Sequence, residues 1–273
     1  MILMAQKYHN ACMSELSALK PGNVHIFADG HGMIVQDFIK SAEVSAPFIS
    51  EPDVTVGTRI FRAIKATREA VGCNTNLGIV LLAAPMMEAA YSSQGFCQNS
   101  LQAVLSNLTV DDAIEAYKAI AIANPAGLGN LDALDVHEPP NVTLLQAMQA
   151  AEDRDLIARQ YSHNFDDIFN IGMASYQHYF SIWDRSAWAT TVVYLNFLVA
   201  FEDTHIVRKH GKSVAATVRQ EAKTHLQNFT PQDNPKLYQA TLMAWDADLK
   251  KRGINPGTSA DMTVATLLAN DLI

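Results

Sequence analysis

The sequence predicts an all-α protein that forms a single multi-helix domain over residues 1–273, with roughly ten or more helices. Apolar residues recur at helical spacing along most of the chain, and no segment keeps the strict alternation of a half-buried strand. Only 10 prolines and 13 glycines interrupt the chain, and they cluster in a few places. Few and clustered breakers favour long elements over many short strands, and 273 residues can bury a substantial core.

Three amphipathic helices are expected in the first quarter of the chain. The first covers residues 3–19 and ends before Pro21-Gly22, because proline disfavours a helical conformation in the residue that precedes it. The second covers residues 38–46 and is expected to end at Pro47. The third covers residues 60–71 and has a basic polar side made of Arg59, Arg62, Lys65 and Arg68.

The middle of the chain predicts a buried helix, a capped helix and a loop. Residues 77–90 are apolar nearly all round, which is typical of a helix at the centre of a bundle. Thr109, with Asp112 three residues later, has the form of a capping box and opens a helix over 113–121. Residues 124–141 hold three prolines, two glycines and several acids, and they predict a loop.

Helical spacing resumes after this loop and continues to the C-terminus. The valine-rich segment 190–195 is the best strand candidate, but its flanks are helical. A sharp turn at Asn255-Pro256-Gly257 precedes a last helix that runs to about residue 270 and that Thr258 or Ser259 would cap. The helices expected between the loop and this turn cover residues 144–151, 155–161, 165–180, 187–201, 214–226 and 236–251.

Composition excludes several classes of partner. The formal net charge is −8 and no run of Lys or Arg occurs, so a nucleic acid would be repelled, whereas a small nucleotide could still find a locally cationic pocket. The longest apolar stretch, residues 77–87, is shorter than the roughly 20 residues that cross a membrane. Cys12, Cys73 and Cys97 lack CxxC spacing and indicate reduced thiols, so a cytoplasmic protein is expected. The apolar N-terminal helix would also allow a homodimer.

Two polar clusters in the N-terminal half interrupt the helical pattern. The first contains Glu15, Lys20-Pro21-Gly22-Asn23, His25 and Asp29. Lys20 at a helix end could interact with the helix dipole, or it could meet a phosphate that the following glycine lets approach closely. The second cluster, residues 72–78, has Asn74, Thr75 and Asn76 just before the buried helix. These side chains would cap that helix, and its free N–H groups would also suit a phosphate.

Two further clusters lie in the C-terminal half. Residues 203–211 contain Asp203, His205, Arg208 and Lys209 within two turns, a combination that on a surface helix would usually be a solvated face. Residues 255–262 begin with Asn255 and contain Asp261, which is expected in the first turn of the last helix, where an acid interacts favourably with the helix dipole. Each of the four clusters therefore also has an ordinary structural explanation.

Signatures of several other chemistries are missing from the sequence. It has no HExxH and no paired CxxC, and His25, His31, His205 and His210 do not share a zinc spacing. It has no GxxxxGK[ST] of a P-loop, no GxGxxG and no Gly-x-Ser-x-Gly. Its carboxylates and amides suit magnesium better than zinc.

Taken in order, these clusters resemble the triphosphoribosyl-dephospho-CoA synthase family. The resemblance spans nearly the whole chain and depends on five segments, which are weak singly and specific together. They are Glu15 with Lys20-Pro21-Gly22-Asn23, Phe38 with Ser41-Ala42, Asn74-Thr75-Asn76-Leu77-Gly78, Asp203-Thr204 with Arg208-Lys209 and Gly211, and Asn255-Pro256-Gly257-Thr258-Ser259-Ala260-Asp261.

The resemblance implies an all-α, magnesium-dependent transferase that uses ATP as a substrate. The ribose 2′-hydroxyl of dephospho-CoA, or of a related cofactor precursor, would attack the anomeric carbon of ATP and release adenine. Such a reaction needs an oxocarbenium-like centre, a purine leaving group and a triphosphate to be stabilised. The implied roles are substrate and phosphate binding by Lys20, Asn23, Asn74, Thr75, Asn76, Arg208, Lys209 and Asn255, metal binding by Asp203, Asp261 and Asp29, and acid–base catalysis by Glu15, His25 or His205.

The sequence departs from the citrate-lyase-associated members of that family after Lys-Pro-Gly. Those members have a His and an Asp where this chain has Gly30 and Gly32, and His25, Asp29 and His31 lie nearby as substitutes. Other segments look closer to a branch from archaea and methylotrophic bacteria, which implies a cofactor pathway such as tetrahydromethanopterin biosynthesis. These segments are Asn23-Val24-His25, Asn76-Leu77-Gly78, and Asp135-Val136 after Pro125-Ala126-Gly127-Leu128-Gly129.

Two alternative functions remain open at this point. The same site could use water to cleave an N-glycosidic bond, in which case adenine would be released without any acceptor. Alternatively, the chain could be a non-catalytic nucleotide-binding protein of a cofactor pathway that lost its chemistry with the changes at Gly30 and Gly32.

Overall fold

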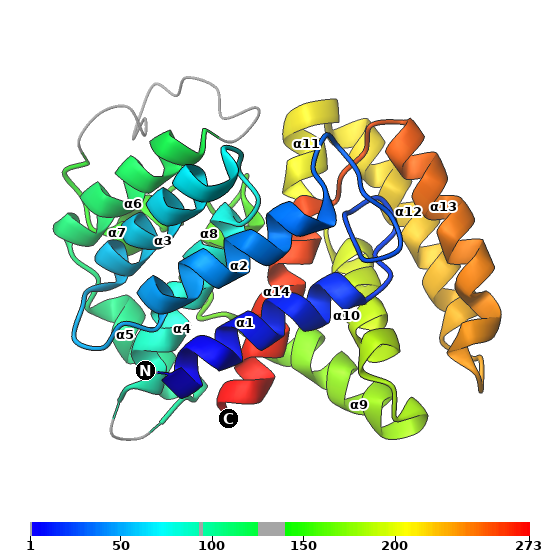
Figure 1. Cartoon of the computed structure of the whole chain (residues 1–273), viewed down its shortest axis with the longest axis horizontal. Coiled ribbons are helices and arrows are strands. Elements are labelled where there is room, and N and C mark those ends of the chain that lie inside the picture. The colour runs from blue at the N-terminus through cyan, green and yellow to red at the C-terminus, as the bar shows by residue number, and fades with distance from the viewer. Residues whose placement is uncertain (1, 93–94, 125–139) are drawn as a thin grey trace.

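The computed structural model describes residues 2–92, 95–124 and 140–273, and this part of the chain folds into helices joined by short connections (Figure 1). It contains fourteen α-helices, one π-helical segment and one 3-10 segment, and the described residues form no β-strand. Two isolated antiparallel bridges occur, between His25 and Ala28 and between Gly30 and Met33. The predicted all-α class is confirmed.

Six helices precede the segment 125–139 in the chain. They are α1 (Ile2–Ser17), α2 (Val35–Ile49), α3 (Val56–Val71), α4 (Leu77–Ala90), α5 (Gln98–Ser106) and α6 (Val110–Ala123). The Thr109–Asp112 capping box that predicted α6 is present, with each residue's backbone N–H bound by the other's side chain. Helix α5 was not expected from the sequence. Its N-cap is Cys97, which pairs reciprocally with Ser100, and this pairing uses residue types that are uncommon in capping boxes.

The helices after that segment largely follow the predicted spacing. They are α7 (Leu144–Gln149), α8 (Leu156–Ser162), a π-helical segment (Ile168–Met173) leading into α9 (Ala174–Trp183), α10 (Ser186–Ala200), α11 (Thr204–His210), α12 (Lys212–Phe229), a 3-10 turn (Pro235–Tyr238) leading into α13 (Gln239–Lys251), and α14 (Gly257–Leu272). The valine-rich segment 190–195 lies inside α10, as its helical flanks indicated.

Three of the differences from the expected helix boundaries involve a proline, a glycine or a capping residue. Pro47 does not end α2, which continues to Ile49, because a proline so close to the C-terminal end removes little of the remaining hydrogen bonding. The helix expected over 165–180 begins as a π-helix, where Gly172 faces α14 so closely that a Cβ atom would lie 2.1 Å from Thr266 Oγ1. The last helix begins at Gly257 rather than at a Thr258 or Ser259 cap.

Helix α14 lies in the middle of the molecule, between the helices α1–α8 on one side and α10–α13 on the other (Figure 1). Its apolar residues pack mainly with the larger hydrophobic cluster, which is built around α4, while Ala260 joins a second cluster formed by α10, α12 and α13. Eleven of the fourteen residues of α4 are buried, which agrees with its apolar sequence on every side. Among the described residues, no helix combines the length and the apolar character needed to cross a membrane.

Candidate active site

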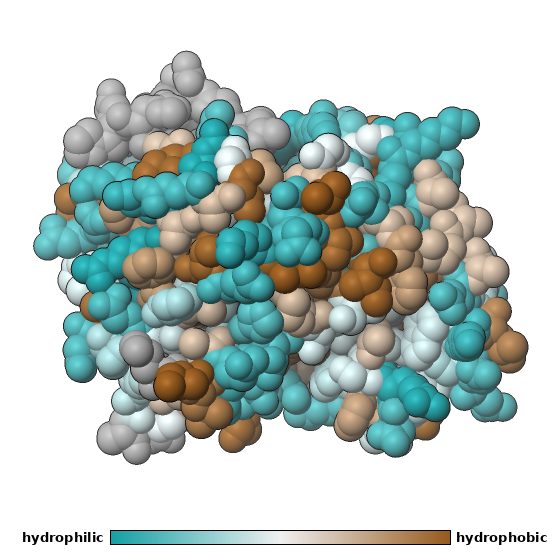
Figure 2. All heavy atoms as spheres, in the orientation of Figure 1, coloured by the Kyte–Doolittle hydropathy of each residue, from teal (hydrophilic) through white to brown (hydrophobic). Residues whose placement is uncertain are grey.

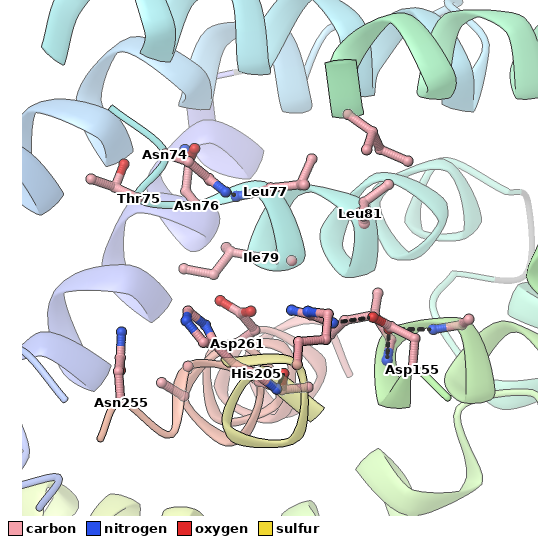
Figure 3. A pocket seen from close by; sticks show the side chains of 18 of the residues that line it. Asn74, Thr75, Asn76, Leu77, Ile79, Leu81, Asp155, His205, Asn255 and Asp261 are labelled. Carbon is pink, nitrogen blue, oxygen red and sulfur yellow. Dashed lines mark hydrogen bonds and ion pairs between the residues drawn. The ribbon is translucent and has the colours of Figure 1, made fainter. Parts of the chain in front are cut away.

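A cavity of about 630 Å³ lies between the N-terminal half of the molecule and the helices α11 and α14. Its walls come from α1, α2, α4, α6, α7, α8, α11 and α14 and from the connection between α1 and α2. Figure 3 shows the segment Asn74–Leu77 on one side of this space, with Asp261, His205 and Asn255 on the other. The four polar clusters of the sequence therefore converge on one cavity.

Ten of the fourteen residues proposed from the sequence line this cavity. They are Glu15, Asn23, Asn74, Thr75, Asn76, His205, Arg208, Lys209, Asn255 and Asp261. The other four, Lys20, His25, Asp29 and Asp203, do not line it.

Lys20 lies behind the wall of the cavity and is fully buried. Its ammonium group forms an ion pair with Glu15 Oε1 at 2.6 Å and donates hydrogen bonds to Asn23 Oδ1 (3.0 Å) and to the Val24 carbonyl (2.7 Å). These three partners match the three protons of a lysine ammonium. Lys20 is therefore placed to hold Glu15 and Asn23 in position, and it does not reach the cavity where a phosphate would bind.

Burial raises the pKa of Glu15, and the charge of Lys20 opposes that rise. Burial likewise lowers the pKa of Lys20, and Glu15 opposes that fall. Glu15 is 5% exposed but borders the cavity, so its carboxylate meets the cavity while Lys20 supports it from behind.

The Lys-Pro-Gly-Asn segment contacts the Asn-Pro-Gly segment directly. Asn23 Nδ2 donates to Asn255 Oδ1 at 2.8 Å. Gly22 has a φ of +85°, and a Cβ atom there would lie 2.9 Å from Pro256 Cδ. The glycine is thus needed for close approach, as the sequence suggested, but the group that approaches is the chain's own Pro256.

Asp203 caps two helices at once. Its Oδ1 accepts from the backbone N–H groups of His205 and Ile206 at the start of α11. Its Oδ2 accepts from the backbone N–H and the hydroxyl of Ser259 in the first turn of α14, both at 2.8 Å. Asp203 is 1% exposed, so both oxygens are occupied and turned away from the cavity. Its place in the motif is explained by joining α11 to α14.

Asp261 is a second carboxyl group that borders the cavity. It lies in the second turn of α14, not in the first turn as expected, because the helix begins at Gly257. Within the described residues, its side chain has no hydrogen-bond partner and no ion pair. Burial raises the pKa of Asp261 well above its usual range, and the charges of Glu15 and Asp203 add to this rise while Arg208 opposes it.

Gly78 makes room for Asp261. A Cβ atom at position 78 would lie 2.1 Å from Asp261 Oδ2, closer than atoms can pack. The glycine in Asn76-Leu77-Gly78 is therefore explained by the close approach of α14 to the N-terminal turn of α4.

His205 packs closely against another glycine, Gly257. A Cβ atom at position 257 would lie 2.6 Å from His205 Nδ1, so the glycine allows the imidazole to lie against the start of α14. Burial lowers the pKa of His205; Asp203 opposes this, while Arg208, Lys209 and His31 lower the pKa further. The lowered pKa favours the neutral form of this imidazole in the free protein.

The cationic part of the cavity comes from α11 and from the turn before α8. Arg208 Nη1 pairs with Asp155 Oδ2 at 2.6 Å, a contact drawn as a dashed line in Figure 3. Lys209 and Arg154 are exposed and also border the cavity. Asp155 uses its other oxygen to cap α8, accepting from Ile157 and Ala158 N–H groups.

Arg154 and Asp155 were missed by the sequence reasoning. An aspartate just before an apolar helical run is a cap signal that was available, whereas its pairing with Arg208 joins residues 53 positions apart and has no local signature.

The Asn74–Asn76 segment caps α4 and also borders the cavity. Asn74 Oδ1 accepts from Leu77 N–H at 3.2 Å and so caps α4, while Asn76 Nδ2 donates to Thr67 Oγ1 at 3.0 Å. Thr75 Oγ1 lies 2.5 Å from Ser41 Oγ, which links this segment to α2. All three residues still border the cavity.

Of the three substitutes for the missing His and Asp, only His31 borders the cavity. His31 Nε2 lies 2.7 Å from the Gly22 carbonyl. His25 is fully buried, with Nε2 3.3 Å from Asp246 Oδ1 on α13. Asp29 is exposed and accepts from Val35 N–H at the start of α2. The segments Pro125–Gly129 and Asp135-Val136, quoted for the archaeal branch, lie outside the described residues.

The opposite end of the cavity is apolar. Its walls there are side chains of α4, α6, α7 and α8: Leu77, Ile79, Leu81, Ile120, Leu144, Ala147, Met148, Ile157 and Ala158. A cavity that combines an apolar end with a few converging polar groups is typical of a small-molecule site.

Comparison with known proteins gives one family and one fold. The CitG family model, described as ATP:dephospho-CoA triphosphoribosyl transferase, matches residues 3–273. A crystal structure from Archaeoglobus fulgidus, provisionally described as a triphosphoribosyl-dephospho-CoA synthase, is similar with a TM-score of 0.65 and 20% sequence identity. The similarity covers 85% of this chain and 97% of that chain, and it shows the fold alone. The comparison with curated proteins found no match.

Proposed function

This chain belongs to the ATP:dephospho-CoA triphosphoribosyl transferase family, and on that premise we propose that its cavity transfers the triphosphoribosyl group of ATP to dephospho-CoA or a related cofactor precursor, with release of adenine. The observation that carries the proposal is the convergence of ten residues from four separated polar clusters on one cavity. Their chemistry, with cations at one side and a free carboxyl beside an imidazole, matches what the transfer requires.

The triphosphate is assigned to Arg208, Lys209 and Arg154. Arg208 and Lys209 are on the same face of the cavity as His205 and Asp261, and Arg154 lies on the adjoining turn. Guanidinium groups bind phosphate oxygens in a bidentate manner, and an arginine already paired with Asp155 is held in a fixed orientation. The Asn23, Asn74, Thr75, Asn76 and Asn255 side chains supply the neutral contacts to the sugar and base. Lys20 acts through Glu15 and Asn23.

Proton transfer is assigned to Glu15 and His205. The 2′-hydroxyl of the acceptor forms the new bond to the anomeric carbon and loses its proton to Glu15, which Lys20 keeps oriented. The bond from that carbon to the adenine nitrogen breaks, and adenine takes up a proton from His205. Burial and the charges of Arg208 and Lys209 lower the pKa of His205 in the free protein. A bound triphosphate offsets the two charges and so raises this pKa, which favours the protonated imidazole.

Magnesium fits this cavity through Asp261 and the substrate. Among the described residues, no three His, Cys, Asp or Glu side chains gather into a metal site. Of the three acids proposed from the sequence, Asp203 has both oxygens occupied and Asp29 lies outside the cavity, which leaves Asp261 with free oxygens. Magnesium is commonly held by one or two carboxylates together with substrate phosphates, and it would neutralise triphosphate charge here.

The family branch, the domain organisation and the cellular location are part of the same proposal. The Asn23-Val24-His25 and Asn76-Leu77-Gly78 segments support the archaeal and methylotrophic branch, and hence an acceptor in a pathway such as tetrahydromethanopterin biosynthesis. The contacts of α14 with α1, α4 and α10 support one domain over residues 1–273. The thiols of Cys12, Cys73 and Cys97, all unpaired, support a reducing, cytoplasmic location.

The test is to incubate the purified protein with ATP, magnesium and dephospho-CoA and to quantify adenine and the conjugate by chromatography and mass spectrometry. Transfer gives adenine and conjugate in equal amounts, abolished by Asp261→Ala and retained in Arg252→Ala, whose side chain pairs with Glu221 and Asp248 away from the cavity. Adenine without an acceptor would indicate a hydrolase. Nucleotide binding with no product from any acceptor would indicate a non-catalytic protein.

A further inference from the structure

The connection between α1 and α2 contains a two-residue hairpin turn that carries His31. Gly30 and Met33 exchange two backbone hydrogen bonds, with N–O distances of 3.2 and 3.0 Å. Between them, His31 and Gly32 have φ angles of +58° and +75°. A type I′ turn requires a positive φ at both central residues. Glycine adopts this conformation freely and histidine uncommonly, and residues held in such a conformation are often found at functional sites.

Both positions at which the chain departs from the citrate-lyase-associated pattern, Gly30 and Gly32, belong to this turn. Gly32 supplies the second positive φ. Gly30 lies against Lys250 of α13, and a Cβ atom at position 30 would be 3.1 Å from the Lys250 Cε. Lys250 in turn donates to the Ala28 carbonyl at 3.1 Å. The two glycines therefore form the turn that presents His31, in addition to removing two side chains.

Hydrogen bonds from behind fix this connection. Residues 26–34 are all exposed or partly exposed, and Figure 2 shows hydrophilic and hydrophobic side chains together on the face that contains them, so burial alone does not place the turn. Asp246 accepts from Gly22 N–H at 2.8 Å, and Tyr194 donates to the Pro21 carbonyl at 2.6 Å. His31 Nε2 lies 2.7 Å from the Gly22 carbonyl. The imidazole therefore has a defined position at the cavity wall.

The contact with Gly22 determines which ring nitrogen of His31 is available to a ligand. A carbonyl oxygen can only accept, so Nε2 carries the proton and Nδ1 of the neutral ring has the lone pair. Burial lowers the pKa of His31; the bond to Gly22 opposes this, and the charges of Lys209 and Lys250 lower the pKa further. Within the described residues, Nδ1 has no hydrogen-bond partner. His31 thus offers one acceptor at the cavity, which suits a hydroxyl group.

His31 and His205 are close to the same turn of the chain. Gly22, whose carbonyl holds His31, lies against Pro256. The next residue, Gly257, lies against the His205 imidazole. Both histidines border the cavity, so a ligand in contact with His205 is also near His31.

Lys209 is within electrostatic range of both imidazoles. Burial is the main cause of the lowered pKa of His31 and of His205, and the charge of Lys209 adds to it in each case. The proposed function assigns the triphosphate to Lys209 and the adenine to His205. The ribose joins these two parts of ATP, so its hydroxyl groups are the donors that come nearest to His31.

We propose that Nδ1 of His31 accepts a hydrogen bond from a ribose hydroxyl of ATP, the 2′ or the 3′, and so makes the protein prefer ribonucleotides to deoxyribonucleotides. The identity of the nucleotide rests on the proposed function. A hydrogen bond to the hydroxyl next to the anomeric carbon strengthens in an oxocarbenium-like transition state, so the same contact would also favour transfer. The hairpin turn is then an element that recognises ribose.

The experiment measures the binding of ATP, 2′-deoxy-ATP and 3′-deoxy-ATP by calorimetry, with magnesium and without an acceptor. The variant is His31→Gly, which removes the imidazole. It also gives a Gly-Gly pair, which suits the same turn and relieves the unfavourable φ at position 31, so the hairpin is kept. His178→Ala is the matched control, because His178 on α9 is exposed and does not border the cavity.

The wild type should bind one deoxy analogue about two- to tenfold more weakly than ATP, as expected for the loss of one hydrogen bond. That analogue identifies the hydroxyl. His31→Gly should bind ATP and this analogue equally, and His178→Ala should keep the preference of the wild type. The two ratios form a double-mutant cycle between side chain and hydroxyl, so a general weakening of nucleotide binding does not affect the comparison.

Equal binding of all three nucleotides by the wild type, or a preference in His31→Gly as large as that of the wild type, would overturn the proposal. The outcome is separate from that for the proposed function because binding is measured without an acceptor. A preference for ATP that depends on His31, together with no adenine release with any acceptor, would refute the transfer function and leave the ribose contact standing.

Discussion

Two ion pairs, Glu15–Lys20 behind the cavity wall and Arg208–Asp155 at the cavity, have the same N–O separation of 2.6 Å but differ in burial. In the Glu15–Lys20 pair the side chains are 7% and 1% exposed, and in the Arg208–Asp155 pair they are 27% and 29% exposed. Lys20 gives all its protons to protein acceptors, whereas Arg208 has an Nε with no partner among the described residues. A buried pair is strongly destabilised when one partner is removed, while an open pair can share its cation with a ligand. We call Glu15–Lys20 the inner pair and Arg208–Asp155 the outer pair. The inner pair therefore stabilises the fold, and the outer pair is available to bind substrate.

The largest effect should come from breaking the inner pair. Lys20→Met keeps the volume but leaves the Glu15 carboxylate buried without a counter-charge, so unfolding should become easier by about 3–5 kcal/mol at pH 7. Urea denaturation measures this loss. Burial raises the pKa of Glu15 and Lys20 opposes that rise, so the buried carboxyl of the variant takes up a proton more readily than in the unfolded chain. The loss should therefore shrink as the pH falls toward the ordinary pKa of an unfolded glutamate, and Lys20→Met/Glu15→Gln should recover part of it. Unchanged stability in the single variant would mean that Glu15 is solvated.

Breaking the outer pair should affect ligand binding instead of stability. Arg208→Ala removes a charged contact to the proposed triphosphate, so ATP should bind about 10- to 150-fold more weakly, the equivalent of about 1.5–3 kcal/mol. The free energy of unfolding should change by less than about 1 kcal/mol, because the pair is partly exposed. Calorimetric titration with ATP and urea denaturation separate the two effects. Arg252→Ala should leave ATP binding unchanged.

Asp261 extends the comparison to a carboxyl group that has no hydrogen-bond or ion-pair partner among the described residues. Its pKa is higher in the folded protein than in the unfolded chain, whose value is about 3.8. The unfolded chain therefore loses its proton first, and stability falls as the pH rises from about 4 toward the folded pKa. Asp261→Asn should remove this loss and raise stability at pH 7, by an amount on the order of 1 kcal/mol, with no gain at pH 3.5. Thermal unfolding of the wild type and the variant at pH 7 and at pH 3.5 measures this difference in stability. An equal change at both pH values would contradict the raised pKa of Asp261.

The smallest effect should come from an exposed pair that serves as a reference. Lys40 and Glu43 on α2 pair at 3.3 Å with side chains about half exposed. Lys40→Ala should change stability by about 0.5 kcal/mol or less. It should leave ATP binding unaffected. A larger effect on stability would show that burial does not separate these pairs.

Much of the fold was predictable because helical spacing and capping are local. The apolar run 77–90, the Thr109–Asp112 box and the breaks at Pro21-Gly22 and Pro256-Gly257 each located an element to within a few residues. Helix α5 was missed because its Cys97–Ser100 cap uses uncommon residue types. Pro47 was wrongly predicted to end α2, because a proline near the last turn removes little of the hydrogen bonding of a helix.

Candidate residues of the site were recoverable from their order in the chain, but the part each plays was not. Residue type and position in the family's motifs assigned Lys20 to phosphate and Asp203 to metal. The structure gives Lys20 three protein acceptors, and it gives Asp203 four donors from two helices. Asp155 and Arg154 were overlooked because their relation to Arg208 spans more than fifty residues.

What the sequence determined by itself was therefore the helical class, most helix boundaries and the set of polar segments that interrupt the helices, since these depend on periodicity and on neighbours a few residues apart. Only the tertiary structure decided which polar side chains face the cavity and which are used up inside the protein. That choice depends on contacts between distant segments, such as Gly22 against Pro256, Gly78 against Asp261 and Gly257 against His205. A buried polar group must be satisfied by whichever partner the packing brings to it, so its role is settled by the fold and not by its residue type.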